Sequence, residues 1–280
     1  MEDFHLIQEN NKNGIKGNKN KSFKFIYLTE EDKQEINILG DKFVLYNKNK
    51  CDLIIDEDIN CELRSKYRFK EKGNHSVTLV INEEINNFSY LFDINTNNTN
   101  LIDTSSLANL DTSEVTDISS MFYGCKNIED FTFVKNWNVS RCKQFAFTFS
   151  HCVFKNLNFL ENWNLSGALN LGSMFYSCVN LNDIKDIKNW NVENVENFKY
   201  MFYACESLTD VNCLQNWNMS KAKNISGMFQ ECKNLLSVDS LYKWKLGDEI
   251  YKKDIILGCN KLLNIPEIFN NTSENTCLIY

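Results

Sequence analysis

The segment W-N-V-E-N-V-E-N-F-K-Y-M-F-Y-A-C-E-S-L-T-D-V-N-C-L-Q-N, residues 190–216, decides how this chain folds, because close variants of it return at a constant interval. Its first residue belongs to a row of tryptophans spaced 26, 27, 27 and 27 residues apart: Trp137, Trp163, Trp190, Trp217 and Trp244. Six cysteines follow at intervals of 27, 26, 27, 27 and 27: Cys125, Cys152, Cys178, Cys205, Cys232 and Cys259. This pattern indicates stacked structural units, each of which buries its apolar face against the next. We therefore expect function to reside in a repeated surface and not in a single pocket.

The apolar positions of one unit predict its local structure. Counted from Trp190, apolar residues fall at +5, +8, +11, +12 and +15, and steps of three and four mark one face of a helix. After Cys205 the spacing changes to Leu208, Val211 and Leu214, which fits a short buried strand and a turn. Each unit is therefore expected to fold as helix, short strand and loop. The tryptophans are expected to be buried spacers, although an exposed aromatic ladder for carbohydrate or peptide stacking is the other interpretation.

The recurring motifs carry a resemblance to a known family. M-F-Y-G-C at 121–125 and W-N-V-S at 137–140 recur in variants with constant spacing. On these motifs, residues 86–269 resemble the BspA-like leucine-rich-repeat proteins. The resemblance implies an α/β repeat fold, a curved leucine-rich-repeat solenoid with a short parallel sheet on one face and helices on the other. It also implies a surface or interaction protein without catalytic activity.

Composition divides the chain into four parts. Residues 1–21 form an Asn/Lys-rich stretch that we expect to be a disordered tail. Residues 22–85 contain short β-prone runs and are expected to form a β-rich N-terminal module, either a cap on the first repeat or an independent binding domain. The repeats follow at 86–269, and residues 270–280 form a C-terminal tail.

Charge and apolar content restrict the partners. A net charge of −7 argues against nucleic acid, because phosphate binding needs clustered Lys and Arg. No apolar run is long enough for a transmembrane helix, and the first residues lack the features of a secretory signal. Most of the eleven cysteines share one repeat position, so we expect a row of free thiols in a reducing cytoplasm. A membrane-associated or cell-surface location is the alternative.

The last four residues, C-L-I-Y at 277–280, have the form of a prenylation signal with Cys277 as the lipidated residue. Tyrosine is not a usual last residue of such a signal, and no basic cluster precedes it, so the anchor would hold weakly. We keep Cys277 as a possible lipidation site.

No catalytic, cofactor or metal site is expected. The histidines His5, His75 and His151 are scattered, and no nucleotide-binding or hydrolase motif occurs. The cysteines lack the paired spacing of zinc sites. The asparagine after each tryptophan falls in an N-x-S sequon at Asn138 and at two equivalent positions, Asn164 and Asn218. Either glycosylation or a structural ladder of asparagine amides explains this residue. The unit of Trp190 keeps the asparagine, as Asn191, but lacks the serine two residues later that a sequon needs, and this favours the ladder.

If a strand follows each cysteine, alternate residues of the strand point outward on neighbouring units. The outward residues are expected to be Asp130, Thr132, Asn156, Asn158, Asp183, Lys185, Asp210, Asn212, Ser237 and Asp239. This stripe is acidic and rich in amides, so it suits a basic or hydrogen-bonding extended segment; a solvated face without a ligand is the other interpretation. A register shift of one residue would exchange the two faces.

Our leading hypothesis from the sequence is a non-catalytic leucine-rich-repeat scaffold that mediates protein–protein interaction through its strand-lined face. The alternative is a cell-surface or membrane-tethered, adhesin-like protein of the BspA family. The two hypotheses differ in their chemistry: export predicts oxidised cysteines and occupied sequons, whereas a cytoplasmic scaffold predicts free thiols without glycans.

Overall fold

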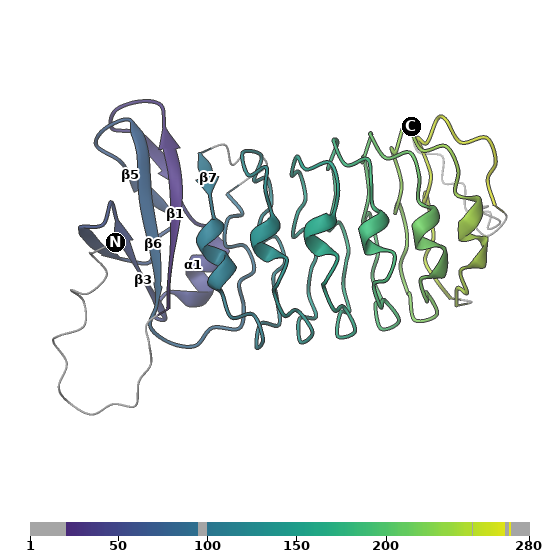
Figure 1. The fold of residues 1–280 in the computed structure, drawn as a ribbon, viewed down its shortest axis with the longest axis horizontal. Coiled ribbons are helices and arrows are strands. Elements are labelled where there is room, and N and C mark those ends of the chain that lie inside the picture. The colour runs from purple at the N-terminus through teal and green to yellow at the C-terminus, as the bar shows by residue number, and fades with distance from the viewer. Residues whose placement is uncertain (1–20, 95–99, 248, 267–268, 270–280) are drawn as a thin grey trace, which may run out of the picture.

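The fold is a β-rich N-terminal module followed by a row of stacked coils (Figure 1). The computed structural model describes residues 21–94, 100–247, 249–266 and 269. The module contains six strands and one α-helix: β1 Lys21–Thr29, β2 Glu35–Asn37, α1 Asp41–Asn47, β3 Cys51–Ile55, β4 Ile59–Glu62, β5 Lys66–Arg68 and β6 Gly73–Ile81. The coils contain strand β7, Leu101–Asp103, and six 3₁₀ turns: η1 Ser105–Asn109, η2 Thr132–Val134, η3 Asn158–Leu160, η4 Lys185–Ile187, η5 Asn212–Asn216 and η6 Asp239–Lys243.

Strand alternation builds the module. In β1 the residues Phe23, Phe25 and Tyr27 are buried and alternate with more exposed neighbours, as expected for a strand with one face on a core. The main sheet has the order β4-β3-β6-β1-β7, and β2 pairs with β5 in a second sheet. The named pairings in both sheets are antiparallel. Strand β7 comes from the repeat region, so the sheet joins the module to the first coils.

Helix α1 covers the first coil. The Phe43 ring stacks on Phe88 at a centroid distance of 6.4 Å, and the Lys42 ammonium lies 4.2 Å from the ring centre of Tyr90. The backbone N–H of Gly40 donates to the Leu91 carbonyl at 3.0 Å. A side chain at position 40 would collide with the Tyr90 carbonyl oxygen, 2.0 Å from an added Cβ, so only glycine allows this approach. The module therefore closes the N-terminal end of the stack.

The predicted α/β leucine-rich-repeat solenoid is wrong. In the described residues the one α-helix is α1, which belongs to the module, and the sheets are antiparallel. No parallel sheet lines a face of the described coils, and no α-helices line the other. Neighbouring coils are joined by isolated parallel bridges, such as Asn170↔Asn197 and Asn197↔Asn224, and by turns.

Left-handed residues explain why the M-F-x-x-C segments are not helical. Ser173 and Ser177 both have φ of 55°, and Tyr200 and Ala204 in the next coil have φ of 57° and 53°. An α-helix of L-residues excludes such angles, because each costs about 1–2 kcal/mol and interrupts the helical hydrogen bonds. The segments are instead successive turns, which bring residues three or four apart to one side as a helix does.

Backbone hydrogen bonds alternate along these segments. The N–H of Met201 closes a turn onto the Phe198 carbonyl at 3.1 Å, whereas the N–H of Phe202 donates to Met228 of the following coil at 2.9 Å. The predicted short strand is also absent: Asp210 makes a single bridge to Ser237, and the chain then enters η5. Each coil thus depends on its neighbours for half of the hydrogen bonds in this segment.

Three ladders of side chains fill the interior of the stack. Phe122, Phe149, Phe175, Phe202 and Phe229 stack on one another with centroid distances of 5.5–6.1 Å. The tryptophans are buried at 3–4% exposure, which confirms the spacer interpretation over the exposed aromatic ladder. Each indole N–H donates to a carbonyl of the preceding coil at 2.8–3.3 Å, as from Trp190 to Leu160. The repeated cysteines form the third ladder.

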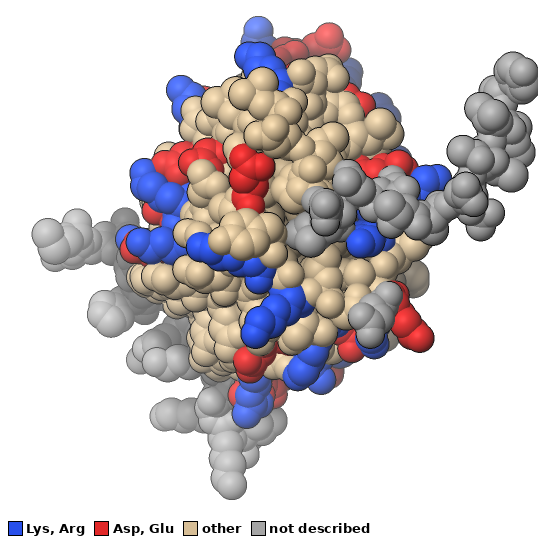
Figure 2. All heavy atoms as spheres, turned by 90° about the vertical axis from the view of Figure 1, so that its right-hand side faces the viewer, with Lys and Arg blue, Asp and Glu red and all other residues tan. Residues whose placement is uncertain are grey.

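Figure 2 looks onto the C-terminal end of this stack and shows scattered lysine and arginine side chains amid uncharged surface.

Replacing Trp190 tests how far the ladders hold the coils together. Trp190→Ala is expected to lower the free energy of unfolding by about 3–5 kcal/mol, because it leaves a large cavity between coils. Trp190→Phe keeps most of the ring and should cost less, since the lost indole bond to the Leu160 carbonyl has a net value of about 0.5–1.5 kcal/mol. Urea denaturation of the two variants measures both values. Equal stabilities of the two variants would contradict a buried tryptophan ladder.

Ser177 distinguishes turns from a helix. Ser177 has φ of 55°, an angle that glycine adopts without cost. Ser177→Gly should therefore leave the free energy of unfolding unchanged or raise it by up to about 1 kcal/mol, whereas Ser177→Val should lower it by about 1–2 kcal/mol. If the segment were a helix, the stabilities of the two variants would be in the reverse order, because glycine in a helix costs about 1 kcal/mol relative to alanine and valine costs less. Chemical denaturation of the pair decides between the two structures.

Candidate functional site

The ten residues predicted to point outward lie along one side of the stack, and we call them the polar edge. All are exposed or half-buried: Asp130, Thr132, Asn156, Asn158, Asp183, Lys185, Asp210, Asn212, Ser237 and Asp239. They do not lie on strands. The second residue of each pair is the first residue of a 3₁₀ turn, and the residue between the two members is the N-cap of that turn. Bridges such as Asn156↔Asp183 and Asp210↔Ser237 place neighbouring pairs side by side.

The first residue of each pair shapes the turn that follows. The Asp130 Oδ1 atom accepts the N–H of Thr132 at 2.7 Å, and Asp210 accepts the N–H of Asn212 at 2.6 Å. Equivalent bonds are made by Asn156, Asp183 and Ser237. Short polar side chains that bond two residues ahead favour turns over strands. The polar edge therefore has a local structural role in addition to any role in binding.

Charge on the polar edge is mainly negative. The Lys185 ammonium donates to Asp183 at 2.6 Å, and this hydrogen bond is the main cause that lowers the pKa of the Asp183 carboxyl and raises the pKa of Lys185. The edge carries three further aspartates at Asp130, Asp210 and Asp239. A basic partner is thus favoured along most of its length.

A hollow of about 530 Å³ lies beside the polar edge, at the one unit that is a residue shorter than the others. Asp130, Thr132, Asn156 and Asn158 line it, together with Lys155. Phe131, Phe154 and Phe159 form its apolar floor. The shortened unit has three residues between Cys152 and Asn156, whereas the following units have four residues between the equivalent positions. The hollow combines apolar contact with carboxylate, amide and hydroxyl groups, as binding sites do.

A second surface was not predicted from the sequence: an aromatic strip over the M-F-x-x-C turns. Its members come from successive coils: Tyr123, Phe147, His151, Tyr176, Tyr200 and Tyr203. Tyr176 and Tyr203 stack in parallel at 4.5 Å, so their faces cover each other and their edges remain for a partner. Burial is the main cause that lowers the pKa of His151, with Lys126 contributing. These residues occupy non-core positions of the repeat, which sequence periodicity treats as solvated.

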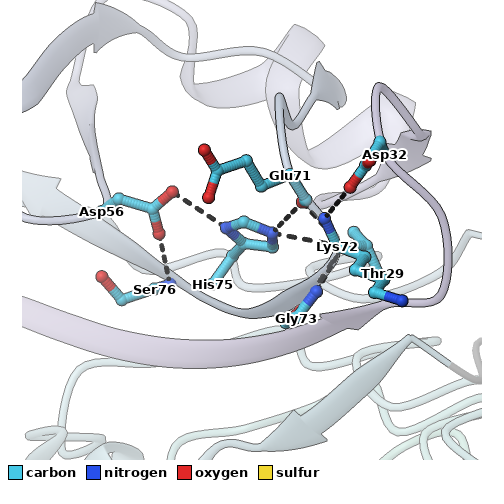
Figure 3. Close-up of polar contacts among 8 residues, drawn as sticks. All are labelled: Thr29, Asp32, Asp56, Glu71, Lys72, Gly73, His75 and Ser76. Atoms are coloured by element: carbon cyan, nitrogen blue, oxygen red, sulfur yellow. Dashed lines mark hydrogen bonds and ion pairs between the residues drawn. The ribbon is translucent and has the colours of Figure 1, made fainter.

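The module holds a cluster centred on His75 that has the elements of a catalytic triad (Figure 3). The Nδ1 atom of His75 lies 2.9 Å from Asp56, and Nε2 lies 3.1 Å from the Thr29 hydroxyl. Nε2 also lies 2.9 Å from the Glu71 carbonyl, which can only accept, so this nitrogen carries a proton and cannot take one from Thr29. Thr29 is 2% exposed and accepts the N–H of Gly73 at 3.1 Å. The arrangement ties β1 and β6 to the turn that follows β3, and it lacks an activated nucleophile.

The asparagines that follow the tryptophans differ from the predicted buried ladder. Asn138, Asn164, Asn191 and Asn218 are exposed, and each accepts a backbone N–H two residues ahead in its own loop, at 3.0–3.2 Å. An amide ladder between coils exists elsewhere: Asn197 donates to Asn170 at 3.0 Å, and Asn170 donates to Gln144 at 3.1 Å. The predicted amide ladder is therefore wrong for the asparagines that follow the tryptophans, and Asn170 and Asn197 form such a ladder instead.

The repeated cysteines are free, buried thiols. Five of them, Cys152, Cys178, Cys205, Cys232 and Cys259, donate to carbonyls of the preceding coil, as from Cys178 to Phe149 at 3.1 Å. Burial is the main cause that raises the pKa of the repeated thiols such as Cys178 and Cys205. Burial also raises the pKa of Cys142, which lies outside the repeated row, to about 12. Among the described residues, no group of His, Cys, Asp and Glu side chains is arranged to hold a metal ion. Among those residues no helix has the length and apolarity to cross a lipid bilayer. Cys277 and His5 lie outside the described residues.

Burial predicts the reactivity of these thiols. At pH 8, iodoacetamide is expected to modify the half-buried Cys61 before any of the buried row, because both access and thiolate fraction are low in the row. Native and denatured labelling followed by peptide mass spectrometry gives the order. Modification of Cys178 at the rate of an unfolded thiol would show that the stack opens readily.

Comparison with known proteins identifies the repeats. The family model described as "Mycoplasma protein of unknown function, DUF285" matches twice, over residues 86–184 and 150–264. No curated protein and no solved structure matches the chain. The two matches together cover more than half of the sequence and include the polar edge and the aromatic strip. The chain therefore belongs to the DUF285 family of repeat proteins.

Proposed function

We propose that this protein is a non-catalytic scaffold that recognises another protein through its polar edge. The observation that carries the proposal is the hollow of about 530 Å³ at the shortened unit, where the polar edge adjoins a floor of phenylalanines. A repeated surface with one local hollow suits an extended partner that is anchored at one point and followed by similar contacts on neighbouring coils. The sequence resemblance to BspA-like proteins supports the same class of function, although not the leucine-rich-repeat fold.

The geometry suggests the length and chemistry of the partner. Bridged coils lie roughly 4.7–4.9 Å apart, so the five pairs of the polar edge span about 19 Å. An extended peptide of about six residues covers that distance at ~3.3 Å per residue. The aspartates of the edge favour lysine or arginine in that peptide. An apolar side chain at one end would enter the hollow beside Phe154 and Phe159.

A charge-neutralising variant tests this proposal without unfolding the turns. Asp130→Asn, Asp183→Asn and Asp210→Asn together remove three charges but keep the oxygen that accepts the turn N–H. The probe is a six-residue peptide of alternating arginine and serine with a terminal leucine. Its affinity is expected to fall about tenfold, since each exposed pair contributes about 0.2–1 kcal/mol. Fluorescence anisotropy at two salt concentrations measures the loss.

A matched control removes three charges from the module instead: Glu30→Gln, Glu31→Gln and Glu62→Gln, all of them exposed. This variant should bind the peptide as the parent protein does. An equal loss of affinity in both variants would mean that net charge, and not the polar edge, attracts the peptide.

The aromatic strip is a second candidate surface for the same class of function. The Phe147 side chain is 41% exposed, and tyrosine edges and hydroxyls suit contact with protein better than stacking on sugar rings, because Tyr176 and Tyr203 already cover each other. Phe147→Ser should leave binding of the basic peptide unchanged. A partner whose binding is lost in Phe147→Ser and retained in the aspartate variant would assign recognition to the strip.

Location separates the scaffold from the adhesin alternative. We propose the cytoplasm, which the free, hydrogen-bonded thiols of the stack support. The exposed sequon residues Asn138, Asn164 and Asn218 support the surface alternative, since their amides are accessible to glycosylation. Intact-mass measurement of protein from its own cell distinguishes the two: an unmodified mass supports the scaffold, and glycan mass or missing thiols the adhesin.

A further inference from the structure

A pair of residues with the geometry of the polar edge lies one coil closer to the module. Asp103, the last residue of β7, accepts the backbone N–H of Ser105 at 2.7 Å, as Asp130 accepts the N–H of Thr132 in the next coil. Asp103 and Ser105 are exposed, and Ser105 is the first residue of η1. The row of turn-forming polar pairs therefore begins on the strand that joins the repeats to the module.

A second hollow, of about 250 Å³, lies between this pair and the next coil. Its polar lining comes from both coils: Asp103, Thr104, Ser105, Glu129, Asp130 and Thr132. Glu129, Asp130 and Thr132 also line the hollow of about 530 Å³. The two hollows therefore lie on opposite sides of one coil, and a partner that occupies the larger hollow is within reach of the smaller one.

The smaller hollow is acidic and has no counter-charge in the described part of the chain. Asp103, Glu129 and Asp130 are exposed, and none of them forms an ion pair with a described lysine or arginine. The described lining contains no basic residue, whereas Lys155 lines the larger hollow. Three carboxylates around one small concavity favour a cation there.

A buried hydroxyl without a partner also points to an occupant of the smaller hollow. Thr104 is 1% exposed, and its Oγ1 atom has no hydrogen-bond partner among the described residues. Thr104 is the N-cap of η1, and the N-caps of the other 3₁₀ turns are buried apolar residues: Phe131, Leu157, Ile184, Val211 and Val238. Packing alone therefore does not require a hydroxyl at this position, and buried hydroxyls are normally hydrogen-bonded.

We propose that the smaller hollow is an ammonium subsite, which takes the side-chain end of a lysine from the partner that binds the polar edge; in this respect it rests on the proposed function. An ammonium is a compact cation with three donors, which suit the carboxylates of Asp103 and Glu129 and the Oγ1 atom of Thr104. A guanidinium is larger and planar, and it fits a small hollow less well.

The position of this lysine in the partner follows from the spacing of the coils. Neighbouring coils lie roughly 4.7–4.9 Å apart, and an extended peptide advances about 3.3 Å per residue. The lysine therefore lies about two residues beyond the apolar side chain that enters the larger hollow.

A small amine tests the subsite without any contact to the rest of the polar edge. The probe is N-acetyl-lysine methylamide, and its matched control is the norleucine analogue, which has an aliphatic side chain without the ammonium. NMR titration of the full-length protein, followed at the backbone amides of Thr104 and Ser105, should give about tenfold tighter binding for the lysine probe. Equal responses to the two probes would overturn the proposal.

Two variants of the hollow keep its shape and remove one interaction each. Thr104→Val removes the unpaired hydroxyl, and Asp103→Asn removes a charge but keeps the oxygen that accepts the Ser105 N–H. Each should weaken binding of the lysine probe about threefold to fivefold. Thr104→Val should also leave the thermal midpoint unchanged or raise it, because it removes an unsatisfied buried group.

Ser240→Ala is the matched control for Thr104→Val. Ser240 also has a buried hydroxyl oxygen without a partner in the described residues, but it lies in η6, away from the hollow. This variant should bind the lysine probe as the parent protein does. Unchanged binding in Thr104→Val, or the same loss in both variants, would mean that the Thr104 hydroxyl does not contact the probe and would overturn the proposal.

An extended peptide separates the failure of the subsite from the failure of the proposed function. The arginine–serine peptide is lengthened beyond its leucine by glycine and lysine, or by glycine and norleucine. The lysine form should bind about tenfold more tightly to the parent protein, and this advantage should shrink in Asp103→Asn. If the unextended peptide is insensitive to the three-aspartate variant, the proposed function fails and the partner with it. If that sensitivity holds but the two extended peptides bind equally, the subsite alone is wrong.

Discussion

The whole repeat region depends on hydrogen bonds that join the turns of one coil to the turns of the next. Outside the module the described coils contain no α-helix, and β7 is their one strand, so a coil cannot satisfy its own buried backbone groups. Alternate N–H groups, such as those of Tyr200 and Phe202, find acceptors in the following coil. The phenylalanine, tryptophan and cysteine ladders then fill the space that this stacking encloses. Cooperativity between neighbouring coils follows from the backbone before any side chain contributes.

The same constraint explains which parts of the fold the sequence could predict. The period of 27 residues, the burial of Trp190 and the inward position of Cys205 follow from repetition and apolarity alone. The turn structure does not, because a run of turns and a helix both bring residues three and four apart to one side. The residue before the repeated cysteine has a left-handed backbone in these coils. It is a glycine at Gly124 and Gly258, but Ser177 and Ala204 occupy it elsewhere and give no sign of that conformation in the sequence.

The candidate site was predictable for a related reason. Asp130, Asp183 and Asp210 were recognised as outward-facing through their place beside buried positions, and exposure depends on that place whether the segment is a strand or a 3₁₀ turn. Their role in shaping the turn was not recognised, because it depends on the bond to the N–H two residues ahead. The aromatic strip and the hollow were missed because both arise between coils: the strip from rings of successive turns, the hollow from a single missing residue before Asn156.

A stack of coils has two ends, and this chain treats them differently. The N-terminal end meets the module, where Gly40 donates to Leu91 and Phe43 covers Phe88, so a folded domain closes it. The C-terminal end meets no such domain in the described residues, among which the backbone N–H groups of Asp254 and Ile256 have no acceptor. A backbone segment that closes this end has to supply carbonyl oxygens to these N–H groups. Since the unpaired donors lie at an end of the stack, the polar edge and the aromatic strip remain available along its length whichever segment closes that end.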